Sequence, residues 1–437
     1  MKKHLLTLSL MAFSTVIMAQ SGTNSPYSQY GLGLMTDPSQ GFNRGMNGVG
    51  LGFREHNQVN YINPASYSAI DSLTFILDAG MSLQTTNFSE NGKKKNANNA
   101  DFEYAVALFR IMKHVGVAAG IVPYSNVGYN YSDKTDIKDY YQVPSTSAAT
   151  TLTNTYYGTG GLHQIFAGIG WEPINGLSIG ANINYLWGDI DNFVENTYSD
   201  NSIKSLIKYY TANVKSYKLD FGAQYTHVFN KKHAVTAGVT YTPGHKLGTN
   251  AECLVLTNNM QSSVNDTTKM VAYDALAIPT QIGVGFAYKY NNQWKAGIDY
   301  TLQRWSGVDF PLYGEKNGIT VYTTESGIFK DRHTIKFGGE YCQNENGRSF
   351  AQRMHYRFGA GYSTPYLNIN GKEGPREYSV SAGIAFPIVN AWNNRSILNI
   401  SVQWANMSSK QMLTENTFRI NIGLTFNERW FAKWRFE

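Results

Sequence analysis

The sequence predicts an all-β fold, a 14-stranded antiparallel transmembrane β-barrel with an N-terminal hatch in its lumen. Three observations support it: about fourteen runs of alternating apolar and polar residues, a secretion signal in front of them, and gaps that alternate between short and long. Because successive strand side chains point to opposite faces, each run has an apolar and a polar face. Such strands are typical of a closed barrel in an outer membrane.

The composition fits this prediction. Charged residues make up 16% of the 437 residues, whereas about a quarter is usual in soluble proteins. A soluble β-protein is the alternative, and it would have to hide the apolar faces in a core. After the leader no stretch approaches the roughly 20 apolar residues of a membrane helix. We find no basic stripe interleaved with aromatic residues, so nucleic acid is not expected as a partner.

The first 19 residues are predicted to be a signal peptide. Lys2, Lys3 and His4 form a basic start, and Leu5–Met18 forms a short apolar core. Ala19 then suits cleavage before Gln20. The segment is too short to span a membrane well as a retained anchor.

Residues 20–71 do not alternate cleanly and are rich in Gly, Asn and Ser. They also contain apolar residues such as Tyr27, Leu32, Phe42 and Met46, which is too much apolar material for a disordered tail. We therefore predict a hatch that folds into the barrel mouth or lumen.

Residues 72–427 are predicted to form the barrel. An even strand count with short turns at one end places both chain ends in the periplasm, and residues 428–437 are then a periplasmic tail. The predicted strands are 72–86, 102–112, 114–131, 161–172, 176–198, 208–229, 232–249, 277–290, 293–305, 332–343, 353–363, 376–387, 395–407 and 416–427.

Several charged residues fall on the inward faces of these strands. The alternation places mixed signs on neighbouring strands, which predicts either a salt-bridge lattice that holds the hatch or a site for an anionic headgroup. From this set we expect Lys336, Arg357 and Arg419 to bind a headgroup or to anchor the hatch. The inward set is Asp78, Lys218, Asp220, Lys295, Asp299, Lys336, Glu340, Arg357 and Arg419.

Pro123 lies inside an otherwise regular strand pattern. Proline removes a donor from the ladder, so it belongs at a bulge, a kink or a break in pairing. A kinked strand would open the barrel wall, whereas a proline near the rim would mark the normal end of pairing.

The run Arg44–Gly50, followed by Val59–Ala65, is a Gly-rich stretch that leads into Asn63-Pro64-Ala65. It resembles the N-terminal hatch of the FadL family of outer-membrane channels for hydrophobic compounds, and a Bacteroidetes-type member in particular. Further segments are similar to the family's kinked third strand and to its central and late strands: Ile121–Tyr124, Ala277–Pro279, Trp294–Trp305 and Gly359–Tyr362.

The resemblance implies a monomeric channel for passive uptake of small hydrophobic molecules, such as long-chain fatty acids or hydrocarbons. Asn63, Pro64 and Ala65 would shape the hatch, and Pro123 and Tyr124 would shape a lateral exit at the kinked third strand. The chain would lie in the outer membrane of a Gram-negative bacterium, in contact with its lipid and lipopolysaccharide.

A second hypothesis comes from the same fold. PorV-like barrels, which bind and shuttle secreted proteins in a secretion system, share a similar Asn-Pro-Ala segment. A capacious outer mouth would favour this role, and a continuous apolar pocket under the mouth would favour transport.

An enzyme is not expected. The sequence contains no G-x-S-x-G and no His-Glu-x-x-His, so no catalytic residues are assigned. His163, His227 and His355 fall on separate strands, and no pair of His or Cys has metal-ligand spacing. We therefore predict no metal and no cofactor.

Overall fold

The structure, a computed structural model, describes residues 22–136, 151–199, 203–259, 264–369, 371–389, 395–410 and 412–429. The predicted leader and most of the predicted tail lie outside these residues. Within the described part of the chain, fourteen antiparallel strands pair in order, and the last strand pairs with the first. The barrel is therefore closed, and the predicted fold class is confirmed.

Every barrel strand corresponds to one of the predicted strands. They are β2 (Thr74–Glu90), β3 (Lys93–Met112), β4 (Val115–Asp136), β5 (Thr151–Ile174), β6 (Leu177–Tyr198), β7 (Ser205–Phe229), β8 (His233–Thr242), β13 (Thr280–Tyr290), β14 (Trp294–Arg304), β17 (Arg332–Cys342), β18 (His355–Ser363), β21 (Arg376–Val389), β22 (Arg395–Ser408) and β23 (Thr414–Arg429).

Several boundaries differ from the prediction; β5, for example, begins at Thr151 rather than at residue 161. The gap expected at 89–101 is wrong, because β2 and β3 stay paired up to Glu90 and Lys93. Both faces of this hairpin tip are polar, so the alternation that marks a strand is missing from its sequence. The strand expected at 232–249 ends at Thr242, because Pro243 cannot donate to a ladder.

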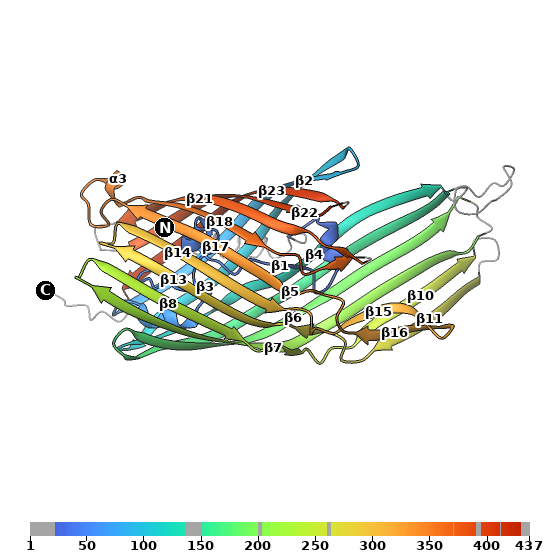
Figure 1. Ribbon diagram of the computed structural model, residues 1–437, viewed down its shortest axis with the longest axis horizontal. Coiled ribbons are helices and arrows are strands. Elements are labelled where there is room, and N and C mark those ends of the chain that lie inside the picture. Colours follow the sequence, from blue (N-terminus) through green and yellow to red (C-terminus); the bar gives the residue numbers. More distant parts are fainter. Residues whose placement is uncertain are drawn as a thin grey trace, which may run out of the picture.

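Short turns gather at one end of the barrel, called here the turn end, on the left of Figure 1. The connections from β7 to β8 and from β13 to β14 are three residues long, and their first two residues, Asn230-Lys231 and Asn291-Asn292, have positive φ. That conformation is the type I′ turn, which Asn tolerates and whose twist matches a β-hairpin. The opposite end carries the longer connections and is called the loop end.

The outward faces form an apolar band bordered by aromatic side chains at both ends, as expected for a barrel surrounded by lipid. Near the turn end the exposed aromatic residues are Trp171, Tyr225, Tyr288, Trp294 and Tyr356. Near the loop end they are Tyr185, Tyr217, Tyr241, Tyr300, Tyr378 and Trp404.

Beyond the loop-end border, part of the wall continues as a projecting sheet (Figure 1). β5 has 24 residues and β7 has 25, which at about 3.3 Å per residue is roughly 80 Å of strand. β10 (Ala251–Asn259) pairs with the upper part of β7, and β11 (Val264–Ala272) pairs with β10. The gap expected at 250–276 therefore contains a hairpin that widens this sheet.

The remaining elements are short. Around the loop end lie β9 (His245–Lys246), β12 (Ala277–Ile278), β15 (Phe310–Lys316), β16 (Ile319–Glu325), β19 (Asn368–Ile369) and β20 (Lys372–Glu373), and α3 (Phe350–Arg353) connects β17 to β18. Before the barrel come η1 (Pro26–Gln29), β1 (Leu34–Met35), α2 (Gly41–Arg44) and η2 (Pro64–Ala69). None of the described helices is long and apolar enough to cross a membrane.

Candidate functional site

The N-terminal segment, defined here as residues 22–73, lies inside the barrel, where Figure 1 shows its blue elements surrounded by strands. α2 packs against β22 and β23, and η2 packs against β4, β5, β6 and β7. Phe42 and Tyr67 are almost fully buried against these inward faces. The segment therefore fills the lumen from the turn end toward the loop end.

Asn63, Pro64 and Ala65 form the start of η2. The Asn63 Oδ1 atom accepts a hydrogen bond from the Ala65 backbone N–H at 3.2 Å, which caps the helix. The Asn63 Nδ2 atom donates to the Leu51 carbonyl at 2.9 Å. Pro64 occupies the first helical position, where its fixed φ is favourable. The motif thus ties two parts of the segment together.

Glycines on the barrel wall make room for this motif. A Cβ atom added at Gly180 would lie 2.4 Å from the Pro64 carbonyl carbon, and one at Gly222 would lie 2.1 Å from the Asn63 Oδ1 atom. Both distances are far inside van der Waals contact. The motif and the wall are therefore matched in shape.

A buried network of charges joins the segment to the wall near the turn end. The Lys295 Nζ atom donates to Glu55 at 2.9 Å and lies 2.9 Å from Glu340. Arg357 donates to Glu340 at 2.6 Å and to Asn399 at 2.6 Å. Burial alone would raise the pKa of the Glu55 carboxyl, but the Lys295 ammonium outweighs burial and keeps that pKa below its usual value. Arg357 therefore holds a wall carboxylate rather than facing an open cavity.

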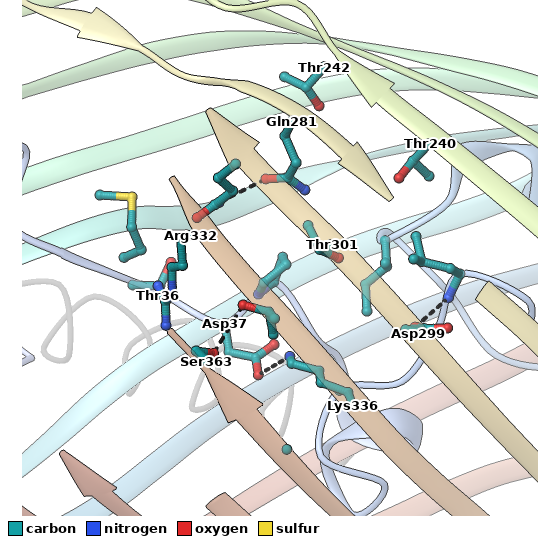
Figure 2. A pocket seen from close by; sticks show the side chains of 18 of the residues that line it. Thr36, Asp37, Thr240, Thr242, Gln281, Asp299, Thr301, Arg332, Lys336 and Ser363 are labelled. Atoms are coloured by element: carbon teal, nitrogen blue, oxygen red, sulfur yellow. Dashed lines mark hydrogen bonds and ion pairs between the residues drawn. The ribbon is translucent and has the colours of Figure 1, made fainter. Parts of the chain in front are cut away.

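Lys336 contacts the segment directly. Its Nζ atom donates to the Asp37 carboxylate at 3.0 Å, and both side chains are about one-fifth exposed (23% and 21%). Burial would raise the pKa of Asp37, but the charges of Lys336 and Arg44 hold it well below its usual range. Figure 2 shows this pair at the floor of a cavity, with Thr36 and Ser363 nearby.

That cavity has a volume of about 230 Å³ and lies toward the loop end, beyond Asp37. Its lining is mixed: Thr242, Gln281, Asp299 and Arg332 are polar or charged (Figure 2), and apolar side chains such as Leu51 also line it. A continuous apolar pocket, which would have favoured transport, is not present at this place.

Arg419 lies in a neighbouring cavity of about 150 Å³. Its guanidinium donates to Gln84 Oε1 at 2.9 and 3.2 Å and to Gln403 Oε1 at 3.1 Å. Among the described residues, the hydrogen-bond partners of Arg419 are neutral amides, whereas Lys336 and Arg357 have carboxylate partners. The three predicted basic residues are therefore not brought together into one site.

The barrel wall is not paired along its whole height. β3 and β4 pair from Met112–Val115 up to Ala105–Ile121. Within the described residues, the rest of β3 pairs with β2, and the rest of β4 pairs with β5 and β1. A gap in the wall therefore begins at Ala105–Ile121 and widens toward the loop end, where the β2–β3 tip stands apart from the teal end of β4 (Figure 1).

Pro123 and Tyr124 border this gap. The register of β4 against β5 shifts between Pro123 and Ser125, which is a bulge at the predicted proline. Thr36 of the segment donates its hydroxyl to the Pro123 carbonyl at 2.6 Å and its N–H to the Tyr124 carbonyl at 3.1 Å. β1 pairs with Ser125 and Asn126 of β4, so the segment lies against the open edge.

A packed apolar cluster fills the loop end of the barrel. Trp305 is fully buried there, and its ring contacts Phe329 and Tyr366. Tyr27 and Leu32 bring the N-terminal segment into the same cluster. The loop end is therefore closed by apolar side chains rather than open as a capacious mouth.

The sequence did not single out Thr36, Asp37, Arg332 or Glu415, all of which line the two cavities. The inward alternation of β17 and β23 would have found Arg332 and Glu415, since they share faces with Lys336 and Arg419. Thr36 and Asp37 lie in a segment without periodicity and carried no signal.

The described residues contain no group of three or more His, Cys, Asp or Glu side chains that could hold a metal ion. His163 and His227 lie on β5 and β7 and do not converge on a shared site, whereas His355 contacts Glu340 at 3.1 Å. The arrangement of the lumen is that of a filled barrel with small cavities.

The fold matches solved outer-membrane barrels. The toluene transporter TbuX of Ralstonia pickettii is 14% identical with a TM-score of 0.60, covering 90% of this chain and 99% of that one. The Pseudomonas putida toluene transporter TodX is 12% identical with a TM-score of 0.60, covering 92% and 100%. A Pseudomonas aeruginosa FadL homologue is 11% identical with a TM-score of 0.58, covering 90% and 98%. At these identities the likeness shows a shared FadL-type fold.

The sequence comparisons give a family. No curated protein matches the chain. The family model described as BamG matches residues 1–437, the whole length of the sequence, and the chain therefore belongs to the BamG family.

Proposed function

We propose that the chain is an outer-membrane channel for passive uptake of small hydrophobic molecules, either long-chain fatty acids or hydrocarbons, with a lateral exit between β3 and β4. The observation that carries the proposal is the gap above Ala105–Ile121, beside the Pro123 bulge. Two barrels with this fold, TbuX and TodX, are toluene transporters, which supports a hydrophobic ligand.

Sideways release suits such a ligand. The gap begins at Ile121, whose side chain is 41% exposed among the lipid-facing residues, so it opens at the level of the outer leaflet. A molecule that leaves there enters hydrocarbon without crossing a polar headgroup layer. Residues 22–37 occupy the gap, and their withdrawal would open it.

Arg419 is the residue that we assign to an anionic headgroup. Its hydrogen-bond partners Gln84 and Gln403 are neutral. The cavity of about 150 Å³, which Asp101 and Glu103 also line, gives a carboxylate room to approach. An Arg–carboxylate pair is bidentate and stronger than an amide contact. Lys336 and Arg357 are assigned instead to anchoring, Lys336 to the segment and Arg357 through Glu340.

Native mass spectrometry of the purified barrel with oleate and with toluene tests the headgroup assignment. Arg419→Gln should lower oleate occupancy by at least about tenfold, because a charge-assisted pair is lost. Toluene has no charge, so its occupancy should stay unchanged. Equal oleate binding by both proteins would contradict the assignment.

A reversible crosslink tests the lateral exit. Met35 and Ser125 are Cα partners in antiparallel pairing, which puts their Cα atoms within the range of a disulfide. The free thiols Cys253 and Cys342 are first replaced by Ala. The oxidised Met35→Cys/Ser125→Cys barrel should stop uptake, and reduction should restore it. The two single-cysteine variants are the controls, and uptake at their rate by the oxidised protein would contradict lateral exit.

The location follows from the same proposal. The turn end, at which β23 ends, faces the periplasm, and the loop end faces outward toward lipopolysaccharide, as in outer-membrane barrels generally. The first described residues of the N-terminal segment lie inside the lumen toward the loop end. We also propose that the chain acts as a monomer, that residues 20–71 are the hatch, and that it is of the Bacteroidetes type.

A second candidate function, the binding of a secreted protein as in PorV-like barrels, is favoured by one observation. The loop end is filled by the apolar cluster around Trp305, and the cavity beneath it is lined by both polar and apolar side chains. A barrel without an apolar entry would serve as a platform. An empty barrel in the mass-spectrometry experiment, with neither oleate nor toluene bound, would support this candidate.

A further inference from the structure

A third cavity, called here the turn-end cavity, lies at the turn end between the N-terminal segment and the strands β7, β8 and β13. Its volume is about 470 Å³, which is within the range of ligand pockets in proteins. The segment supplies residues 52–56 and 68–71 to its lining, and none of its lining residues lines either of the two cavities described above. The segment therefore separates the turn-end cavity from them.

One wall of the turn-end cavity is a row of inward residues on three neighbouring strands. Cross-strand register places Val228 of β7 beside Ala234 of β8, and Ala234 beside Lys289 of β13. Because neighbouring strands lie about 4.8 Å apart, Val228 and Lys289 are roughly 10 Å from each other along this row. The short side chains of Ala234 and Ala287 leave the space between the wall and the segment open.

The apolar end of this row is uncovered. Side chains alternate along β7, so Val228 faces the lumen as Val214 does, whereas Phe229 faces outward. Val214 is fully buried, but Val228 is 58% exposed. Val228 thus presents an apolar surface to the turn-end cavity, and a ligand that covers it is stabilised by the water that it displaces.

The other end of the row carries a positive charge without a partner. Lys289 and Lys295 are Cα partners, so two ammonium groups lie side by side on the inward face, which is unfavourable. Lys295 pairs with Glu55 and Glu340, whereas no carboxylate of the described residues lies within 4.0 Å of the Lys289 ammonium. Burial would raise the pKa of Glu55, but Lys295 and, more weakly, Lys289 lower it. Lys289 therefore lies near Glu55 without pairing with it.

The two arginines that line the turn-end cavity are engaged in contacts between the wall and the segment. Arg54 donates to Glu172 at 2.8 Å, and Arg110 donates to the Ile70 carbonyl at 3.4 Å. Among the lysines and arginines of this cavity, Lys289 is thus the one that makes no hydrogen bond to the part of the chain that the structure describes. An anion can reach Lys289 without breaking a contact there.

We propose that the turn-end cavity binds a small amphiphilic anion, a molecule with one carboxylate or phosphate group on a short apolar body. The anionic group contacts Lys289, and the apolar body covers Ala234 and Val228. The cavity lies at the end of the barrel that the proposed location assigns to the periplasm, so the ligand enters from that side. This site is separate from the one assigned to Arg419, and it does not depend on uptake through the lumen.

Protection of an introduced thiol tests the site in the full-length protein in lipid nanodiscs. Cys253 and Cys342 are replaced by Ala, and Val228→Cys then places an exposed thiol in the cavity. Saturating hexyl phosphate or hexanoate should slow its alkylation by N-ethylmaleimide at least about fivefold, because the bound ligand covers the thiol. Hexanol at the same concentration should give little protection, because it has no charge. The more protective anion identifies the source of the ligand, a phosphate ester or a fatty acid.

Lys289→Gln in the same background is the decisive variant. It should raise the concentration of either anion that gives half protection by at least about tenfold, because a charge-assisted contact is lost. Ser72→Cys, an exposed thiol at the turn end but outside the cavity, is the matched control and should not be protected. Heat-modifiable mobility on gels should show that all variants are folded barrels.

Arg419→Gln should leave the protection of Val228→Cys unchanged, which separates this site from the proposed uptake path. The proposal is overturned if neither anion protects Val228→Cys, or if hexanol protects it as well as the anions do. It is also overturned if Lys289→Gln is protected at the same concentration, or if Arg419→Gln removes the protection.

Discussion

Two parts of the N-terminal segment are held in the barrel in different ways. Residues 38–73 contact the wall through buried charges and close shape matching. Asp299 accepts hydrogen bonds from the N–H groups of Gly50 and Leu51 at 2.7 and 2.9 Å, and Lys295 binds Glu55 with both side chains 5% exposed.

Residues 22–37 are held toward the loop end by hydrogen bonds, by β1 pairing and by apolar contacts, and their ion pair with Lys336 is more exposed. These contacts include two residues of β1 pairing, the hydrogen bond from Ser25 to Glu415 at 2.5 Å, and the one-fifth-exposed pair of Lys336 with Asp37. Tyr27 and Leu32 add apolar contacts at the loop end. The difference supports the proposal that the wall opens at the gap while residues 38–73 stay in place.

The largest expected effect separates the two parts by stability. Lys295→Ala should cost about 3–5 kcal/mol of unfolding free energy, because it leaves the buried carboxylates of Glu55 and Glu340 unpaired. Lys336→Ala should cost about 1 kcal/mol or less, because water reaches its pair with Asp37. Urea unfolding in detergent, followed by gel mobility, measures both values. Equal losses of unfolding free energy in the two variants would contradict the difference between the two parts of the segment.

The close fit between η2 and the glycines of the wall can be disrupted by a substitution that leaves all charges unchanged. Gly180→Val should destabilise the protein by roughly 1–3 kcal/mol and expose η2 to protease, because the new side chain overlaps Pro64. Gly314→Val is the control, since nothing lies within 4 Å of a Cβ atom built there. If η2 in the Gly180→Val variant stays protected from protease, the wall can shift to accommodate the new side chain, which would contradict the tight fit that the contact distances indicate.

The bulge at the gap can be changed next. Pro123→Ala should straighten β4 and lower uptake by at least about twofold while leaving the barrel folded, because the proposed function makes the gap the exit for the ligand. Pro387→Ala, in β21 on another part of the wall, should leave uptake unchanged. Uptake of labelled oleate by proteoliposomes gives both rates, and a normal rate for Pro123→Ala would count against lateral exit.

Mild acid should have the smallest effect. The pKa of Asp37 is depressed in the folded protein, so its pair with Lys336 stabilises the fold above the unfolded pKa of about 3.9 and is lost only as pH falls through the lower folded value. The free energy of unfolding should therefore differ between wild type and Asp37→Asn by the same amount at pH 7 and pH 5. A difference that vanishes by pH 5 would show that the pair is not intact.

The sequence predicted most of the barrel, because strands in contact with lipid must alternate. Inward residues such as Lys295 and Glu340 followed from the same parity, and Pro123 marked the bulge because proline cannot pair. The hairpin at 251–272 was not predicted, because it lies beyond the lipid and needs no apolar outward face. The alternation of apolar and polar residues within one strand also cannot show that β3 and β4 separate above Ala105–Ile121, because pairing depends on both strands.

The role of Asn63-Pro64-Ala65 shows a similar limit. The motif predicted a hatch by resemblance, but its contact with Gly180 and Gly222 depends on which strands lie beneath η2. The sequence could not predict the contact partners of Arg419 and Lys336 either. Both are basic residues on inward faces. Only the tertiary contacts show that Lys336 pairs with a carboxylate and that Arg419 pairs with amides.

Hydrogen exchange of the folded barrel in detergent tests the central contrast most directly. The account predicts that amides of residues 24–36 exchange at least about tenfold faster than those of residues 43–66, because the outer part opens without the inner part. Equal protection of the two stretches would contradict it, since the gap could then open only if the whole segment left the lumen.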